Sequence, residues 1–322
     1  MAGRRHLKRI GGFSGAAALA AAVLLAAAPS PARAQGAAEP PLDASLRERV
    51  IRVTKPGVWA PTLEVTLFSP PGDGPFPVAV INHGKASGDP RWQGRARYAL
   101  PSRALVERGF LVVLPMRAGF SKSTGSYMEV GCNTESNGLV QADDVAAVLD
   151  HVATLPEADT TRTIVMGQSH GGLVTLALGT LDRPGVRGLV NFAGGLRYTQ
   201  CVAWEDGLAR TFAAYGAKTR VPSLWFYGDN DSYWSRPVWE AMHRAYVGAG
   251  GDARMVAFGS FATGDAHGMF GSRAGQSIWL PEFDRFAATL GLANARTSGR
   301  PVRTGPAASG AGDGAPRPAP SD

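Results

Sequence analysis

One ten-residue stretch constrains this chain more than any other: Thr163–Gly172, with the sequence TIVMGQSHGG. Its first four residues form an apolar run typical of a buried strand, and Leu173–Leu178 continues as an apolar helix. Between the two, Gly167–Gly171 matches the pattern G-x-S-x-G, which in a strand–turn–helix context marks a reactive serine. The pattern predicts that Ser169 is a nucleophile at a helix N-terminus, where peptide dipoles favour developing negative charge.

The two glycines of this pattern have a steric purpose. A serine raised above a sheet needs a strained backbone, and side chains at Gly167 and Gly171 would collide with the adjacent strand and helix. The same letters also arise by chance in a chain with 41 glycines. An acid and a histidine that follow in the right order would therefore strengthen the prediction.

Both ends of the chain differ in composition from its middle. Residues 1–34 combine basic residues at the start, an Ala/Leu/Val-rich segment and the cleavage pattern Ala32-Arg33-Ala34, as an export signal does. The segment is too weakly hydrophobic for a membrane anchor, and Arg4-Arg5 leaves both the general and the twin-arginine routes open. We expect a linker over residues 35–49, a catalytic domain over 50–293 and a disordered tail over 294–322.

The charge and the cysteines narrow the class of protein further. The five basic residues of the signal and the net positive charge of the tail account for the formal charge of +7. The folded part is thus near neutral, so the high pI does not indicate a nucleic-acid partner. Cys132 and Cys201 are the two cysteines, and an oxidising compartment favours a disulfide over two free thiols. Neither belongs to a metal-binding motif.

Apolar strands and helices alternate through the middle of the chain. Two strands come first, near residues 50–53 and 63–67, and repeated strand–helix units follow. Their strands lie near residues 77–82, 110–115, 163–166, 186–192, 223–228 and 254–258. This pattern predicts a mainly parallel sheet of about eight strands with helices on both faces.

A serine hydroxyl needs a base and an orienting acid, which a parallel sheet presents in loops after its later strands. Of the six histidines, His267 alone follows the last strand on a glycine-flanked loop, so it is the predicted base. Asp229 and Asp231 follow the strand at 223–228, and Asp265 is a third candidate acid. We favour Asp231, although all three also suit turns.

The negative oxygen of a tetrahedral intermediate needs hydrogen-bond donors. The backbone N–H of His170, directly after the nucleophile, is one expected donor. The second should come from the loop after the strand at 77–82, where Lys85 is favoured and Gly84 is the alternative. Both roles belong to the backbone, so the charge of Lys85 is not required for them.

The chain resembles the α/β-hydrolase superfamily and, within it, the dienelactone-hydrolase-like serine hydrolases, over about Val50 to Leu290. The matching segments are Ile81–Gly84, Pro115–Gly125, Gly167–Gly171 and Tyr227–Asp231, together with His267. The order Ser169, Asp231, His267 is that of the superfamily, and the resemblance implies an α/β-hydrolase fold. Dienelactone hydrolases proper use a cysteine nucleophile, so serine here favours ester chemistry.

We expect a periplasmic or secreted hydrolase that cleaves a small-molecule carboxylic ester through an acyl-enzyme, without cofactor, metal, nucleic acid or stable membrane anchor. A peptidase or amidase of the same fold, and a non-catalytic binding protein, are the alternatives. Four aromatic side chains are candidates for the substrate pocket, with ordinary packing as the other interpretation: Tyr127, Trp204, Trp234 and Phe270. A Cys132–Cys201 disulfide would join two loops beside that pocket.

Overall fold

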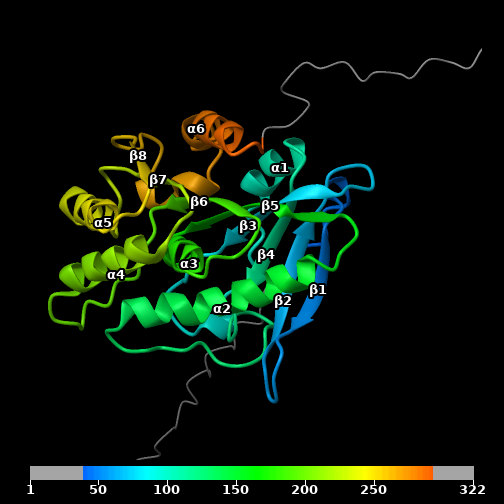
Figure 1. The fold of residues 1–322 in the computed structure, drawn as a ribbon, viewed down its shortest axis with the longest axis horizontal. Coiled ribbons are helices and arrows are strands. Elements are labelled where there is room, and N and C mark those ends of the chain that lie inside the picture. Colours follow the sequence, from blue (N-terminus) through cyan, green and yellow to red (C-terminus); the bar gives the residue numbers. More distant parts are fainter. Residues whose placement is uncertain (1–38, 293–322) are drawn as a thin grey trace, which may run out of the picture. The chain divides into compact units, whose positions relative to one another are not determined.

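The computed structural model describes residues 39–292, which are built around one eight-stranded sheet (Figure 1). Its strands are β1 (Arg49–Thr54), β2 (Thr62–Phe68), β3 (Phe76–Asn82), β4 (Leu111–Met116), β5 (Ala158–Gln168), β6 (Val186–Phe192), β7 (Ser223–Tyr227) and β8 (Ala253–Ala257). They lie in the order β1-β2-β4-β3-β5-β6-β7-β8. Only β2 runs antiparallel to its neighbours, and this confirms the predicted, mainly parallel sheet.

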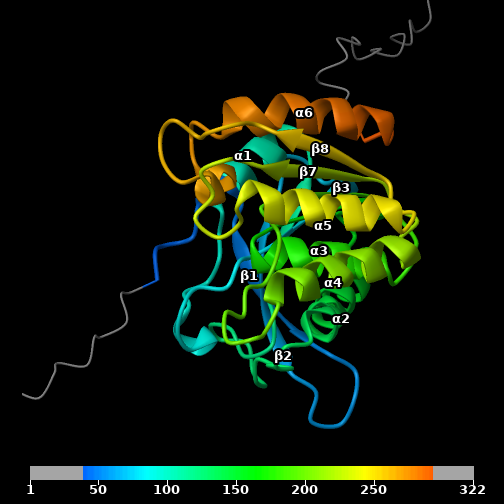
Figure 2. The ribbon, with the colours of Figure 1, turned by 90° about the vertical axis from the view of Figure 1, so that its left-hand side faces the viewer.

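Helices cover both faces of the sheet, as the alternating pattern predicted (Figure 2). The longer helices are α1 (Ala99–Glu107), α2 (Thr134–Val152), α3 (His170–Gly179), α4 (Trp204–Lys218), α5 (Arg236–Gly248) and α6 (Gln276–Thr289). Three short 3-10 turns complete the elements: η1 (Ala44–Leu46), η2 (Pro90–Trp92) and η3 (Ala266–Gly271). Helices α2 to α5 pack on one face, whereas α1, α6 and η3 pack on the other.

Residues of one strand alternate between the two cores. In β3, Val78 and Val80 join the core beneath α2–α5, while Ala79 and Ile81 join the core beneath α1 and α6. All four are fully buried. A strand covered on both faces must be apolar at every position, which explains the continuous apolar runs of the sequence.

One helix begins earlier than the apolar pattern suggests. The sequence places its start near Leu139, but α2 starts at Thr134. Asn133 caps it, because its side-chain oxygen accepts a hydrogen bond from the Ser136 amide at 2.9 Å. Glu135 in the first turn also suits the positive end of the helix dipole. Polar capping residues therefore extend the helix beyond its apolar stripe.

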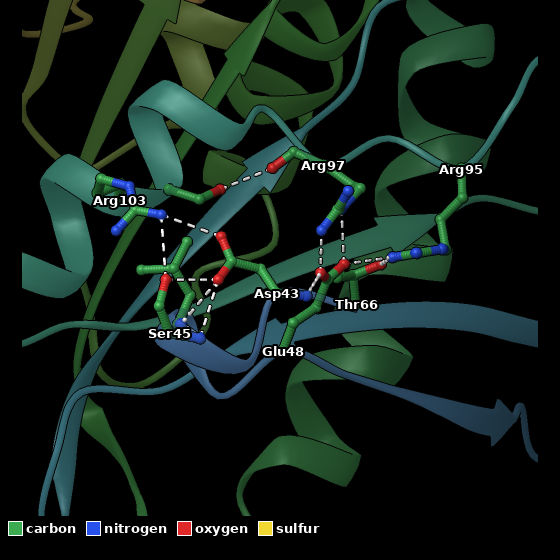
Figure 3. Close-up of polar contacts among 9 residues, drawn as sticks. Asp43, Ser45, Glu48, Thr66, Arg95, Arg97 and Arg103 are labelled. Atoms are coloured by element: carbon green, nitrogen blue, oxygen red, sulfur yellow. Dashed lines mark hydrogen bonds and ion pairs between the residues drawn. The ribbon is translucent and has the colours of Figure 1, made fainter. Parts of the chain in front are cut away.

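The segment before β1, part of the expected linker, forms regular structure and places Leu46 in the core. Residues 44–46 form η1, and β1 already starts at Arg49. Between them, the side chain of Glu48 is fully buried and forms ion pairs with Arg95 and Arg97 (Figure 3). The Asp43 amide also donates to Glu48, at 2.7 Å. The buried carboxylate of Glu48 thus connects this segment to the rest of the domain through ion pairs.

Burial and pairing act on Glu48 in opposite directions. Burial by itself would raise the pKa of this carboxyl, but hydrogen bonds from Arg97 and Arg95 outweigh it and lower the pKa. Arg95 Nη1 lies 2.8 Å from the carboxylate and also donates to Thr66 Oγ1 at 2.9 Å. The cluster therefore ties the N-terminal segment to β2 and to the loop before α1.

A disulfide joins Cys132 to Cys201, with their Cα atoms 5.8 Å apart. Cys132 lies just before α2, and Cys201 lies in the loop between β6 and α4. The expected staple between these two loops is therefore present.

The expected export signal (1–34) and tail (294–322), and the first residues of the expected linker, lie outside the described residues. Between residues 39 and 292, no helix combines the length and apolar character that a membrane crossing requires.

Replacing Glu48 by alanine should lower the free energy of unfolding by about 3 kcal/mol, because two arginines would lose their buried partner. Urea denaturation at pH 7 measures this. Stabilisation by Glu48 should be complete above the ordinary pKa of 4.5 and lost as the pH falls through the lower folded-state value. As a control, Glu240→Ala removes half-exposed pairs with Arg236 and Arg244 and should cost less than about 1 kcal/mol. Equal losses in both variants would contradict the prediction.

Replacing Cys132 and Cys201 together by serine should cost about 4 kcal/mol, because a crosslink across 69 residues restricts the unfolded chain. Intact mass after alkylation, with and without prior reduction, tests the bond directly. Two thiols that react without reduction would show that the bond is absent.

Candidate active site

Ser169 lies at the turn between β5 and α3, in the strained conformation that the pattern predicted. Its φ of 58° and ψ of −126° are rare for a residue with a side chain. A Cβ atom added at Gly167 would collide with the Gly171 carbonyl, and one added at Gly171 would collide with Asn82. The Ser169 amide donates to Phe192 of β6 at 2.9 Å. Two neighbouring strands and one helix therefore fix the position of the serine.

His267, in η3 after β8, faces Asp231 in the loop after β7. Its Nδ1 lies 3.1 Å from each carboxylate oxygen of Asp231. The carboxylate side chain is fully buried and also accepts from the amides of Tyr233 and Trp234, at 2.8 and 3.0 Å. An ionised carboxylate so placed would hold the proton of the imidazole on Nδ1 and leave Nε2 as the basic nitrogen.

The other candidate acids are engaged elsewhere. Asp229 forms an ion pair with Arg236 at 2.6 Å. Asp265 accepts from the backbone amides of His267 and Ser232, at 2.9 and 3.1 Å, and so shapes the loop without contacting the imidazole ring. Among the histidines of residues 39–292, only His267 pairs with a carboxylate. The geometry therefore favours Asp231 and His267 over their rivals.

Tyr233 covers the imidazole, a role that the sequence did not reveal. Its ring stacks on His267 with centroids 4.3 Å apart, and the guanidinium carbon of Arg197 lies 4.8 Å from the centroid of the Tyr233 ring. Arg197 Nη1 also donates to the Tyr233 carbonyl, at 3.2 Å. Tyr233 lies two residues after Asp231 in the same loop. A single aromatic residue in a loop gives no local signal of such stacking.

Gln168 and Tyr98 hold the serine turn against its surroundings. Gln168 Nε2 donates to the His267 carbonyl at 2.8 Å, and Gln168 Oε1 accepts from the Tyr98 hydroxyl at 3.0 Å. The variable position of G-x-S-x-G thus connects the serine turn to the histidine loop. Sequence reasoning passed over both residues, because neither residue type is required by the pattern.

Two cavities meet at Ser169. One, of about 160 Å³, extends toward Gly195, Arg197 and Tyr198. The other, of about 300 Å³, extends toward Gln93, Tyr98 and His267. Ser169, Lys85 and Tyr233 line both. A substrate with its carbonyl carbon at Ser169 could place one part in each cavity.

The amides expected to stabilise an oxyanion come from two different elements. Lys85 follows β3, and His170 is the first residue of α3. Neither amide donates to another described residue, whereas the Gly84 amide is already bonded to the Tyr98 hydroxyl at 3.2 Å. This favours Lys85 over Gly84 as the second donor.

Two of the four expected pocket aromatics lie elsewhere. Phe270 is 1% exposed and stacks on Phe192, with centroids 4.0 Å apart, in the core beneath α6. Trp204 packs on the opposite core and against Trp234, 6.2 Å between centroids. Phe270 packs on a residue of β6 and Trp204 packs on Trp234, so neither ring lines the two cavities at Ser169.

The other two aromatics border the site. Trp234 lines the smaller cavity, although its ring is buried and its Nε1 donates to the Ala193 carbonyl at 2.7 Å. Tyr127 lines a neighbouring cavity of about 510 Å³, with Asp89 and Met128. Tyr127 thus lines neither of the two cavities at Ser169.

The side chain of His170 forms its hydrogen bonds in the interior, although the residue lines the smaller cavity. It is buried, and its Nε2 lies 2.7 Å from Asn137 Oδ1 while its Nδ1 lies 3.1 Å from Arg117 Nη2. Burial, followed by the charge of Arg117, lowers the pKa of His170 well below its ordinary value. The ring is therefore neutral and cannot serve as a base toward the cavities. Within residues 39–292, no group of histidine, cysteine and acidic side chains is arranged to hold a metal ion.

Comparison with known structures shows that the fold is that of α/β hydrolases. A dienelactone hydrolase-like promiscuous phosphotriesterase from metagenomic libraries has a TM-score of 0.52 at 17% identity, over 76% of this chain and 98% of its own. An esterase from Pyrococcus furiosus has a TM-score of 0.53 at 14% identity, over 76% and 91%. These similarities show the fold.

A puromycin-hydrolysing peptidase from Mycobacterium tuberculosis has a TM-score of 0.56 at 19% identity, over 76% of this chain. The match covers only 40% of that peptidase. No curated protein sequence matches the chain.

The family model of the X-Pro dipeptidyl-peptidases (S15 family) matches residues 61–244, more than half of the chain. This span contains Ser169 and Asp231, and His267 lies beyond it. The chain belongs to the X-Pro dipeptidyl-peptidase (S15) family and is a serine hydrolase with the α/β-hydrolase fold.

Proposed function

We propose that this protein is an exported hydrolase that cleaves small carboxylic esters through an acyl-enzyme. The carrying observation is that both Asp231 oxygens lie 3.1 Å from His267 Nδ1, while His267 and Ser169 line one cavity. In this proposal Ser169 attacks the ester carbonyl, His267 accepts its proton, and Asp231 orients the imidazole and stabilises its charge. No cofactor or metal takes part.

The same groups complete the reaction in two stages. The amides of His170 and Lys85 stabilise the negative oxygen of each tetrahedral intermediate. His267 returns its proton to the departing alcohol, then accepts a proton from the water that attacks the acyl-enzyme and passes it to Ser169 as the acid leaves. The side chains of Ser169 and His267 form no hydrogen bond with each other in this structure. In ligand-free hydrolases such contacts often tighten only when substrate binds.

The charges around the serine favour an ester over an X-Pro dipeptide. A dipeptidyl-peptidase must bind the free ammonium group of its substrate, which calls for a carboxylate near the nucleophile. Neither cavity has an acidic residue among the described residues that line it, and the cations Lys85 and Arg197 are present instead. An ammonium group would be repelled there. The alternative function, peptide or amide cleavage, has the family match in its favour.

Export is part of the proposal and has two supports. The first 34 residues have the composition of a cleavable signal, with Ala32-Arg33-Ala34 at its end. The Cys132–Cys201 bond suits an oxidising compartment such as the periplasm or the exterior.

Ser169→Ala should lower kcat/KM for a p-nitrophenyl ester by several orders of magnitude and abolish labelling by a fluorophosphonate probe. Asp231→Asn should cost about 10⁴-fold in kcat, because the amide favours the wrong imidazole tautomer. Asp229→Asn is the matched control and should retain activity within a few-fold. Esterase rates and intact mass after labelling measure these effects. Wild-type protein that stays unlabelled would support a non-catalytic binding protein instead.

A substrate panel should show hydrolysis of p-nitrophenyl acetate and butyrate, with little release of p-nitroaniline from alanyl-proline p-nitroanilide. The physical reason is the pair of cations beside the serine. Initial rates at equal enzyme concentration, with Ser169→Ala as the blank, provide the comparison. Faster cleavage of the dipeptide anilide than of either ester would reverse the assignment to a dipeptidyl-peptidase.

A further inference from the structure

Arg117 is a fully buried arginine directly behind the serine turn. It follows β4, its exposed fraction is 0%, and both of its hydrogen-bond partners are neutral side chains. Arg117 Nε donates to Gln141 Oε1 at 3.1 Å, and Nη2 donates to His170 Nδ1 at 3.1 Å. The third nitrogen, Nη1, is buried without a hydrogen-bond acceptor among the described residues. The ring of Phe120 lies 5.1 Å from the guanidinium carbon.

No carboxylate in the described part of the chain forms an ion pair with Arg117. Asp144 is close enough to influence it, but its oxygens are bonded to Lys55 Nζ at 2.7 Å and to the Ala118 amide at 2.8 Å. Burial lowers the pKa of Arg117 to about 10, so the side chain still carries its charge at neutral pH. The interior behind Ser169 thus contains a positive charge that no carboxylate of residues 39–292 contacts by a hydrogen bond.

Apart from Asp144, the titratable groups around this charge are neutral. Burial, followed by the charge of Arg117, lowers the pKa of both His83 and His170 well below the ordinary value. Burial raises the pKa of Tyr98 and Tyr127, which keeps their hydroxyls protonated. Burial of an ion without a directly bonded carboxylate lowers folding stability, so its presence here calls for a reason other than packing.

The contacts of His170 connect Arg117 to the proposed chemistry. Arg117 donates to Nδ1, so the remaining ring proton must lie on Nε2, which donates to Asn137 Oδ1 at 2.7 Å. The ring is thereby held from both sides. The backbone amide of the same residue is a proposed oxyanion donor, and a negative charge forms there only during the reaction. An oxyanion bound at that amide would then bring negative charge to the residue that Arg117 contacts.

We infer that Arg117 is a positioning residue for the proposed ester hydrolysis: it fixes His170 and supplies positive charge that favours the anionic intermediate. The inference rests on the proposed function. It differs from a purely structural role, because a neutral donor would satisfy His170 and Gln141 equally well. Stabilisation that exists only when the oxyanion forms should raise kcat with little effect on KM.

Two substitutions separate charge from hydrogen bonding. Arg117→Gln keeps an N–H donor but removes the charge, whereas Arg117→Lys keeps the charge on a different donor. Arg108→Met is the control for loss of an arginine far from the serine, since Arg108 pairs with Asp284 on α6. Thermal unfolding of each variant sets an assay temperature at which all are folded.

The readout compares a charged and a neutral ligand as well as esterase kinetics. A trifluoromethyl ketone that adds to Ser169 forms an oxyanion, and the corresponding secondary alcohol cannot. Arg117→Gln should lower kcat about 10- to 100-fold, less than the loss of a direct oxyanion donor, with KM within about twofold. Affinity for the ketone should fall by a similar factor, and affinity for the alcohol should not change. Arg117→Lys should recover most of both losses.

Other results would overturn the inference. Equal impairment in Arg117→Gln and Arg117→Lys would show that charge is not the cause, and unchanged kcat in Arg117→Gln would show that Arg117 is dispensable. A parallel loss of alcohol binding would indicate distortion of the cavity. If the wild-type protein itself neither hydrolyses esters nor reacts with the ketone, the proposed function fails, and the inference fails with it.

Discussion

The backbone turn at Ser169 is the constraint on which the rest of the site depends. A positive φ at a residue with a side chain is unfavourable and persists only when its surroundings impose it. Here the Phe192 carbonyl of β6 accepts a hydrogen bond from the Ser169 amide. The end of β3 passes so close to Gly171 that no Cβ atom would fit there. Every residue of α3 is buried, so the helix cannot tilt to relieve the turn. Packing around the turn thus stabilises the strained backbone that presents the Ser169 hydroxyl.

Parallel strand direction explains how distant residues reach that hydroxyl. Strands β5, β7 and β8 run the same way, so the loops that follow them open at one edge of the sheet. Asp231 and His267 are 36 residues apart in sequence, yet their side chains are 3.1 Å apart. The sheet sets their separation, while the neighbouring amides and the ring of Tyr233 set their orientation.

Features encoded locally were predictable from the sequence. Continuous apolar runs indicated doubly covered strands, and the two glycines of the serine turn required close backbone approach. Phe270 shows where such reasoning ends: three residues after His267, it faces the core because η3 turns it toward Phe192. Arg117 and Tyr233 act through neighbours distant in sequence. Their environments arise only from tertiary packing, so no local pattern identified them.

Cys132 and Cys201 divide the chain into a covalent ring and a remainder. The ring contains α2, β5, α3 and β6, and therefore the nucleophile. Asp231 and His267 lie beyond it, and the main chain after Cys201 is their one covalent connection to the ring. One protease cut inside the ring releases no fragment, whereas one cut between Cys201 and Asp231 leaves acid and base attached only by non-covalent contacts. Resistance to nicking is therefore unequal between the two halves of the same site.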